Sequence, residues 1–112
     1  MRPKEPSDGE AQSEQAVIVY LDGVGLPDQV YQEYDLATLE DKLSEVIELN
    51  SLGEFDGNEV GPGGATLFMY GSDAEKLFRG IVSALRACPL CQGAQVVIRY
   101  GAPGTEQRKV TI

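Results

Sequence analysis

The chain has 112 residues and a formal net charge of −9, with 42% hydrophobic and 24% charged residues, a composition typical of one small globular domain. It contains no histidine, which excludes histidine-based acid–base catalysis, the Ser-His-Asp and Cys-His nucleophile systems, and Cys/His zinc sites. The negative charge argues against nucleic acid or an anionic membrane as the partner, and no apolar run reaches the ~18 residues that a membrane span requires.

Residues 1–15 are polar and contain two prolines. Because they have little apolar surface to bury, the sequence predicts a disordered acidic tail, followed by a single domain over residues 16–112. The tail also lacks the apolar stretch of a signal peptide, so we expect a cytoplasmic protein whose two cysteines are free thiols.

The first half of the domain is predicted as a strand, a helix and a polar strand. Ala16–Leu21 is apolar and β-branched, which indicates a central strand. A loop punctuated by glycine and proline follows. A helix is expected over residues 36–50, with Thr38 opening a capping box and Asp35 as a competing cap. Its apolar side is formed by Leu39, Leu43, Val46 and Ile47.

The rest of the domain is predicted as a hairpin, a helix and a second hairpin. Residues 54–60 and 65–70 are expected to form a hairpin. A second helix begins with a capping box from Ser72 to Glu75 and is stopped by Pro89. Strands over residues 94–100 and 107–112 form a second hairpin.

This order of elements predicts an α+β fold, a ferredoxin-like βαββαβ sandwich with one extra C-terminal strand. Two helices would cover one face of a mainly antiparallel sheet. Right-handed crossovers would place residues 16–21 and 65–70 side by side at the centre. The extra strand would cover the outer edge of the strand over residues 94–100.

Charge is concentrated in residues 22–59, which contain eleven acidic residues and one base, Lys42. The outer face of the first helix is therefore strongly negative, and repulsion between Asp41 and Glu45 weakens the helix slightly. A helix whose exposed face served only solubility would carry both acidic and basic residues. The excess of acidic residues therefore indicates a docking face for a basic partner. A solvated face without a partner is the alternative.

The segment Gly53–Gly61 is unusually polar for a strand. Regular alternation would place Glu54, Asp56 and Asn58 on one face. Phe55, Gly57 and Glu59 would lie on the other face, toward the helices. Such a conflict between local propensity and position is typical of functional sites. A charged edge strand that resists aggregation is the simpler interpretation.

Asp56 and Glu59 are candidates for metal binding or for acid–base catalysis. An EF-hand pattern starting at Asp56 fails at Val60 and at Leu67, where a bidentate glutamate is needed. A weak divalent-cation site, or a catalytic carboxylate pair, stays open as an alternative. No metal, cofactor or catalytic residue is predicted.

Cys88 and Cys91 form a Cys-x-x-Cys segment at the end of the second helix. The C-terminal end of a helix does not stabilise a thiolate, which argues against a thioredoxin-like role. We expect Cys88 to be a small core residue and Cys91 to lie in the following turn. A zinc site shared between two subunits and a regulatory disulfide are the alternatives.

The segment Asp56–Gly61, followed by Ala65–Gly71 and by Asp73 and Ala74, resembles one found in short bacterial proteins without a known activity. The resemblance covers roughly residues 53–101. It implies a bacterial, cytosolic, ferredoxin-like domain and no catalytic residues. In size and acidity the chain is also similar to immunity proteins that neutralise basic toxins.

We therefore expect a non-enzymatic domain that docks a basic protein partner in an immunity or regulatory role, with tyrosines as aromatic anchors at the rim. The predicted partner-binding residues are Tyr31, Tyr34, Glu40, Asp41, Glu45, Glu48, Glu54, Asp56 and Glu59. The main alternative is a homodimeric regulatory domain that binds a small molecule or metal on its open sheet face, lined by Thr66, Phe68 and Tyr70.

Overall fold

The computed structural model describes residues 15–112, which form five strands, three α-helices and a short 3-10 helix. The strands are β1 (Gln15–Asp22), β2 (Glu54–Gly61), β3 (Gly64–Gly71), β4 (Gln95–Arg99) and β5 (Gln107–Thr111). The helices are α2 (Asp28–Glu33), α3 (Leu36–Leu49), α4 (Ala74–Ala87) and the 3-10 helix η1 (Pro89–Cys91). The tail predicted for residues 1–15 lies outside the described residues except for Gln15, which begins β1.

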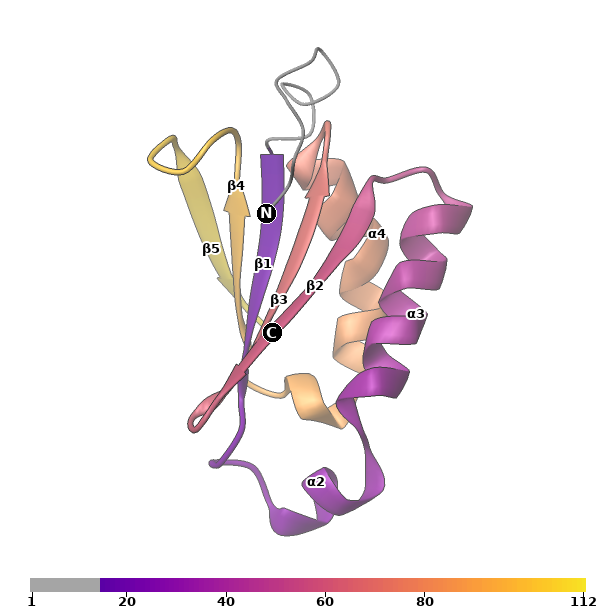
Figure 1. The fold of residues 1–112 in the computed structure, drawn as a ribbon, viewed down its shortest axis with the longest axis vertical. Coiled ribbons are helices and arrows are strands. Elements are labelled where there is room, and N and C mark those ends of the chain that lie inside the picture. The colour runs from indigo at the N-terminus through magenta and orange to yellow at the C-terminus, as the bar shows by residue number, and fades with distance from the viewer. Residues whose placement is uncertain (1–14) are drawn as a thin grey trace.

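The five strands form one open sheet in the order β2-β3-β1-β4-β5, and every neighbouring pair is antiparallel. Helices α3 and α4 lie together on one face of this sheet (Figure 1). The predicted α+β class is confirmed, and so is the central position of β1 beside β3. The arrangement is compatible with a ferredoxin-like fold. The C-terminal strand β5 pairs with the outer edge of β4, as predicted.

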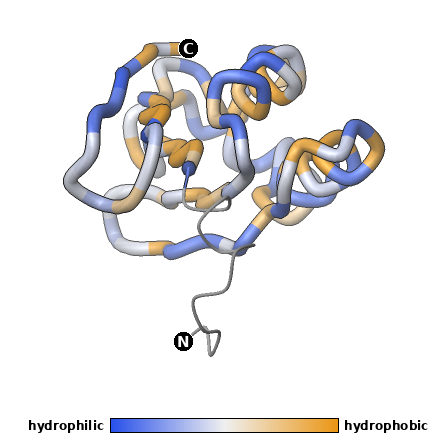
Figure 2. The backbone as a smooth tube through the Cα atoms, turned by 90° about the horizontal axis from the view of Figure 1, so that it is seen from above, coloured by the Kyte–Doolittle hydropathy of each residue, from blue (hydrophilic) through white to orange (hydrophobic). Residues whose placement is uncertain are grey.

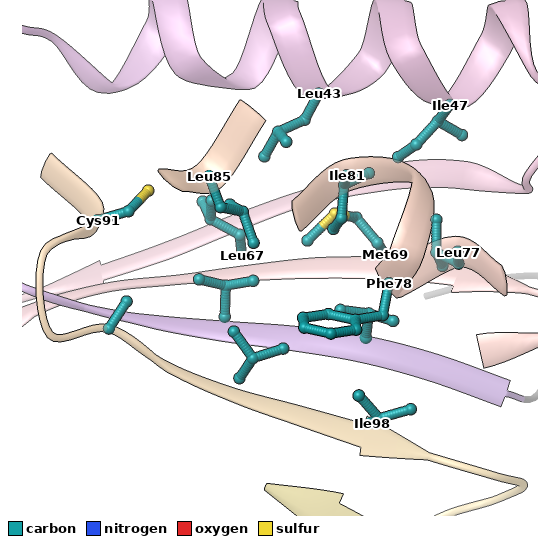
Figure 3. Close-up of a cluster of buried hydrophobic side chains, with 14 of the residues drawn as sticks. Leu43, Ile47, Leu67, Met69, Leu77, Phe78, Ile81, Leu85, Cys91 and Ile98 are labelled. Carbon is teal, nitrogen blue, oxygen red and sulfur yellow. The ribbon is translucent and has the colours of Figure 1, made fainter. Parts of the chain in front are cut away.

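The main core lies between the sheet and the two long helices. Alternation along β1 turns Val17 and Val19 toward the helices, where both are fully buried. Helical periodicity brings a second apolar layer to meet them, and in the view from above hydrophobic and hydrophilic segments follow one another around the helices (Figure 2). Each buried leucine or isoleucine of this layer contributes roughly 1.5–3 kcal/mol. Figure 3 shows Leu43, Ile47, Leu77, Ile81 and Leu85 of the helices above Leu67, Met69 and Ile98 of the sheet.

Aspartates cap both long helices. The carboxylate of Asp35 accepts a hydrogen bond from the Thr38 amide at 2.8 Å, which confirms Asp35 rather than Thr38 as the cap of α3. Asp73 caps α4 in the same way through the Lys76 amide. The capping box predicted from Ser72 is therefore wrong, because with Asp73 as the cap Glu75 sits too early in the helix to reach back to it.

The short helix α2 was not expected, since the sequence predicts only a loop after β1. It has six residues, none of them fully buried, and follows Pro27 without a side-chain cap. A helix this short has no apolar stripe for a periodicity argument to detect. Among residues 15–112, no helix has the length and apolarity needed to cross a membrane.

Candidate functional site

The outer side of α3 carries the first part of the predicted acidic surface. Asp41, Glu45 and Glu48 are exposed on the side of the helix opposite Leu43 and Ile47, which are buried in the core. The helical repeat separates the two groups in this way. This part of the prediction is confirmed: three carboxylates lie on one exposed helix face.

Lys42 is the one basic residue of α3, and it does little to neutralise that face. Its Nζ lies 3.8 Å from Glu45 Oε1, and both side chains are 60% exposed. An ion pair this exposed to solvent contributes under ~1 kcal/mol. The outer side of α3 therefore keeps a net negative charge.

Glu40 does not share the outer face of α3 predicted for it. It is half-buried on the flank of the helix that faces β2, where its carboxylate accepts a hydrogen bond from Asn58 Nδ2. At 100° per residue, Glu40 falls between the core positions and the outer face. This hydrogen bond joins α3 to β2.

A bulge in β2 changes the predicted orientation of its side chains. The pairing with β3 shifts between Phe55 and Gly57, so Asp56 is an extra residue without a partner. Beyond the bulge every side chain is turned to the other face, as a one-residue slip requires. The predicted alternation is confirmed for Phe55, which packs against the main core. It is wrong for Asn58, which faces the helices opposite Leu67, and for Glu59, which lies on the face away from them.

The carboxylates of β2 are exposed and lie beside those of α3. Glu54 and Glu59 stand opposite Tyr70 and Thr66 on the sheet face away from the helices, and Asp56 occupies the bulge. The Glu40–Asn58 hydrogen bond holds α3 against β2, so the exposed acids of these two elements lie along the same edge of the molecule. Those of α3 face away from the sheet, whereas Glu54 and Glu59 lie on the other sheet face. We call the exposed acids of these two neighbouring elements the acidic side. It consists of Asp41, Glu45, Glu48, Glu54, Asp56 and Glu59.

The other acids of residues 22–59 lie at the end of the molecule that holds the β1–α2 loop and α2. Asp22 Oδ1 accepts hydrogen bonds from the amides of Val24 and Gly25 at 2.9 and 2.8 Å, and these bonds hold the pKa of Asp22 below its usual range. The hydrogen bonds from Thr38 lower the pKa of Asp35 in the same way. These two carboxylates are therefore fixed in position and ionised at neutral pH.

Both predicted aromatic anchors lie at this same end. Tyr31 and Tyr34 line a cavity of about 390 Å³. The Tyr31 hydroxyl donates a hydrogen bond to the Asp22 carbonyl at 2.9 Å and accepts one from the Leu26 amide at 3.1 Å, so it has a structural role. Tyr34 is 41% exposed and is the more accessible of the two. Sequence reasoning found the tyrosines but missed the cavity, since its walls come from segments far apart in the chain.

The opposite side of the molecule carries basic residues that are tied to the fold. Arg108 of β5 donates two hydrogen bonds to the carboxylate of Glu75 on α4, at 3.0 and 2.9 Å, and Tyr100 donates a third. The Arg108 hydrogen bonds are the main reason that the pKa of Glu75 lies below its usual range. The Arg108 guanidinium also lies 6.0 Å from the centre of the Phe78 ring. This cluster was not predicted.

The sheet face away from the helices carries a second, smaller apolar cluster. Phe68 and Tyr70 lie on this face as expected, and they pack against Ala16, Ile18 and Val97. These last three residues are buried in the chain itself, with at most 7% exposure. Less apolar surface is therefore open on this face than the sequence predicts.

The two cysteines are reduced and differ in burial. Cys88 is half-buried against the main core, as predicted, whereas Cys91 lies in η1 and is fully buried, which its place in a turn did not suggest. Burial, together with the neighbouring Cys88, raises the pKa of the Cys91 thiol to about 12. At neutral pH this thiol is protonated and therefore a poor nucleophile or metal ligand. Within residues 15–112, no group of three or more histidine, cysteine or acidic side chains is placed to hold a metal ion.

Searches against protein-family models, curated proteins and solved structures found no significant match to this chain.

Proposed function

We propose that this chain is a non-enzymatic binding domain whose acidic side docks a basic protein partner. The observation that carries the proposal is the charge of that side. Its six carboxylates are exposed, and Lys42 is the one basic residue in the chain between residues 16 and 75. Such a surface attracts a basic protein over long range and favours one orientation of approach.

The scaffold beneath the acidic side suits this role. The β2 strand is held to β3 along its length, and α3 packs on the same sheet through buried leucine and isoleucine side chains. A rigid surface loses little conformational entropy on binding. Most of the favourable electrostatic interaction with the partner would then contribute to the binding affinity.

We also propose that the fold is ferredoxin-like with one added strand. The support is the strand order β2-β3-β1-β4 with antiparallel neighbours, together with crossovers through α3 and α4. An immunity or regulatory role in the cytoplasm fits a small acidic domain that works by charge complementarity.

The test is capture of partners from a native lysate by the immobilised chain, at about 50 mM and about 500 mM salt. We compare the wild type with D41K/E45K/E48K and with a matched control, E5K/E10K/E14K, which makes the same change in net charge outside the described residues. Proteins that bind through the acidic side are captured at low salt by the wild type and by the control, and are lost from D41K/E45K/E48K. Equal capture by the two triple variants would overturn the proposal.

The alternative of a homodimeric regulatory domain rests on the small apolar cluster of the open sheet face. Phe68 and Tyr70 are half-buried there and would be the contact residues of a second copy. Light scattering decides this alternative, because a strict monomer across the accessible concentration range removes it.

A further inference from the structure

Two strongly exposed hydrophobic side chains lie at the cavity lined by Tyr31. Among residues 15–112, Tyr34 is 41% exposed and Val60 is 66% exposed, and both line this cavity. Tyr20 at 45% and Val24 at 71% are also exposed, but they do not line it. Scattered single residues of this kind are ordinary, but exposed apolar side chains that meet at one cavity indicate a binding surface.

The size of this cavity limits what it can hold. Its volume of about 390 Å³ is at the small end of the range for ligand pockets, so it fits one or two large side chains. Leu36 and Leu90 contribute apolar walls, and Val60 brings the end of β2 to the rim. The cavity therefore lies at the end of β2, the strand that carries Glu54, Asp56 and Glu59.

The walls are held in place before any ligand arrives. The Gly23 amide donates a hydrogen bond to the Gly63 carbonyl at 3.0 Å, which ties the β1–α2 loop to the hairpin tip. The backbone of Gly64 also packs closely against β1, because a Cβ added at Gly64 would lie only 2.0 Å from the Leu21 carbonyl oxygen. The Tyr31 hydroxyl bridges the two sides of the β1–α2 loop. A preformed cavity binds without the entropy cost of ordering its walls.

Charge selects the kind of ligand. Asp22 and Asp35 line the cavity, and backbone amides hold one oxygen of each carboxylate in place. Among residues 15–112, no Lys or Arg lines the cavity. An apolar site with fixed carboxylates favours a ligand that combines an apolar body with a positive charge.

We propose that this cavity receives a large apolar or aromatic side chain of the basic partner, with an adjacent arginine or lysine paired to Asp22 or Asp35. This inference rests on the proposed function and names the partner's anchor. In this proposal the cavity provides the close contacts with the partner, which the charge of the acidic side alone does not provide.

The probes are three blocked pentapeptides titrated into the isotope-labelled full chain and followed by amide chemical shifts. Ac-Gly-Arg-Phe-Arg-Gly-NH2 carries both features, Ac-Gly-Arg-Gly-Arg-Gly-NH2 only the charge, and Ac-Gly-Gln-Phe-Gln-Gly-NH2 only the ring. We expect the first peptide to bind roughly tenfold more tightly than the Arg-Gly-Arg peptide, since burial of one aromatic ring is worth at least that factor. It should also bind more tightly than the Gln-Phe-Gln peptide, which lacks the positive charge. Its shifts should centre on Tyr31, Tyr34, Leu36 and Val60.

Two variants test the cavity itself. D22N/D35N removes both charges and keeps the hydrogen bonds, because asparagine also serves in turns and helix caps. It should reduce binding of the Arg-Phe-Arg peptide to the level of the Gln-Phe-Gln peptide, whereas D73N, the same change at the cap of α4, should leave binding unchanged. Tyr34→Ala replaces an exposed side chain and should remove most of the advantage of the phenylalanine.

Three results would overturn the inference: equal binding of the two arginine peptides, shifts confined to residues 41–48 and 54–59, or equal binding of the Gln-Phe-Gln peptide, which would indicate a neutral apolar ligand. None of them bears on the acidic side, whose failure appears separately as equal capture by D41K/E45K/E48K and E5K/E10K/E14K.

Discussion

The two outer strands of the sheet, β2 and β5, carry charge of opposite sign and hold it differently. On β5, Arg108 is bound by both carboxylate oxygens of Glu75 and lies over Phe78. On the acidic side, no Lys or Arg among residues 15–112 pairs with Asp41, Glu48, Asp56 or Glu59. The comparison teaches that a carboxylate near β5 stabilises the fold through its ion pair, whereas Asp41, Glu48, Asp56 and Glu59 add little to its stability.

The largest expected effect on stability comes from a substitution in the turn between α3 and β2. Gly53 has φ 141°, and a Cβ there would lie 1.9 Å from the Tyr70 carbonyl oxygen. Gly53→Ala should lower the free energy of unfolding by at least ~2 kcal/mol through strain and backbone displacement. Gly63→Ala is the control, since a Cβ there meets nothing within 4 Å. Urea unfolding of both variants provides the measurement, and equal midpoints would contradict this account of the turn.

A second variant removes the charge that holds β5. Glu75→Gln loses the charge-assisted hydrogen bonds to Arg108, and we expect a loss of ~1 kcal/mol, kept modest because both side chains are partly exposed.

The loss should depend on pH in a direction set by Glu75. Because the folded state lowers the pKa of this carboxyl from its ordinary value of 4.5, its contribution is fully present above pH ~4.5 and disappears as the pH falls through the lower folded value. The difference between wild type and Glu75→Gln should therefore be constant from pH 7 to about 5 and shrink below that. A difference independent of pH down to about 2 would assign the effect to packing.

Tyr31→Phe sharpens the comparison at the cavity end of the molecule. The variant keeps the ring and removes the hydroxyl that bonds Asp22 and Leu26, so we expect a loss of ~0.5–1.5 kcal/mol. Amide exchange in residues 22–26 should become faster, because the loop loses its bridge. Tyr34→Phe is the matched control, and protection unchanged in Tyr31→Phe would show that the hydroxyl does not fix the loop.

The smallest effect on stability is expected from the acidic side itself. D41N/E45Q/E48Q removes repulsion between Asp41 and Glu45 along α3 and the weak Lys42 pair, so the free energy of unfolding should change by no more than ~0.5 kcal/mol. Thermal unfolding at low and high salt measures the change. A loss above ~1 kcal/mol would mean that these carboxylates stabilise the fold, and the contrast with β5 would fail.

Most of the fold could be predicted because its signals are local. The apolar runs of β1 and β3 and the spacing of Leu39, Leu43 and Ile47 fixed the order of elements and their buried sides. The exposed acids of α3 followed from the same periodicity. What could not be predicted was α2, which has no fully buried residue, and the bulge at Asp56, which depends on pairing with β3.

By itself, the sequence determined the elements, the buried face of each helix and the negative charge of residues 22–59, because these depend on residues a few positions apart. Only the tertiary structure decided that Asn58 joins Glu40, that Glu75 holds Arg108 across 33 residues, and that Tyr31 and Tyr34 meet the end of β2 around one cavity. Such contacts are set by how strands pair and helices pack, and no local pattern encodes that geometry.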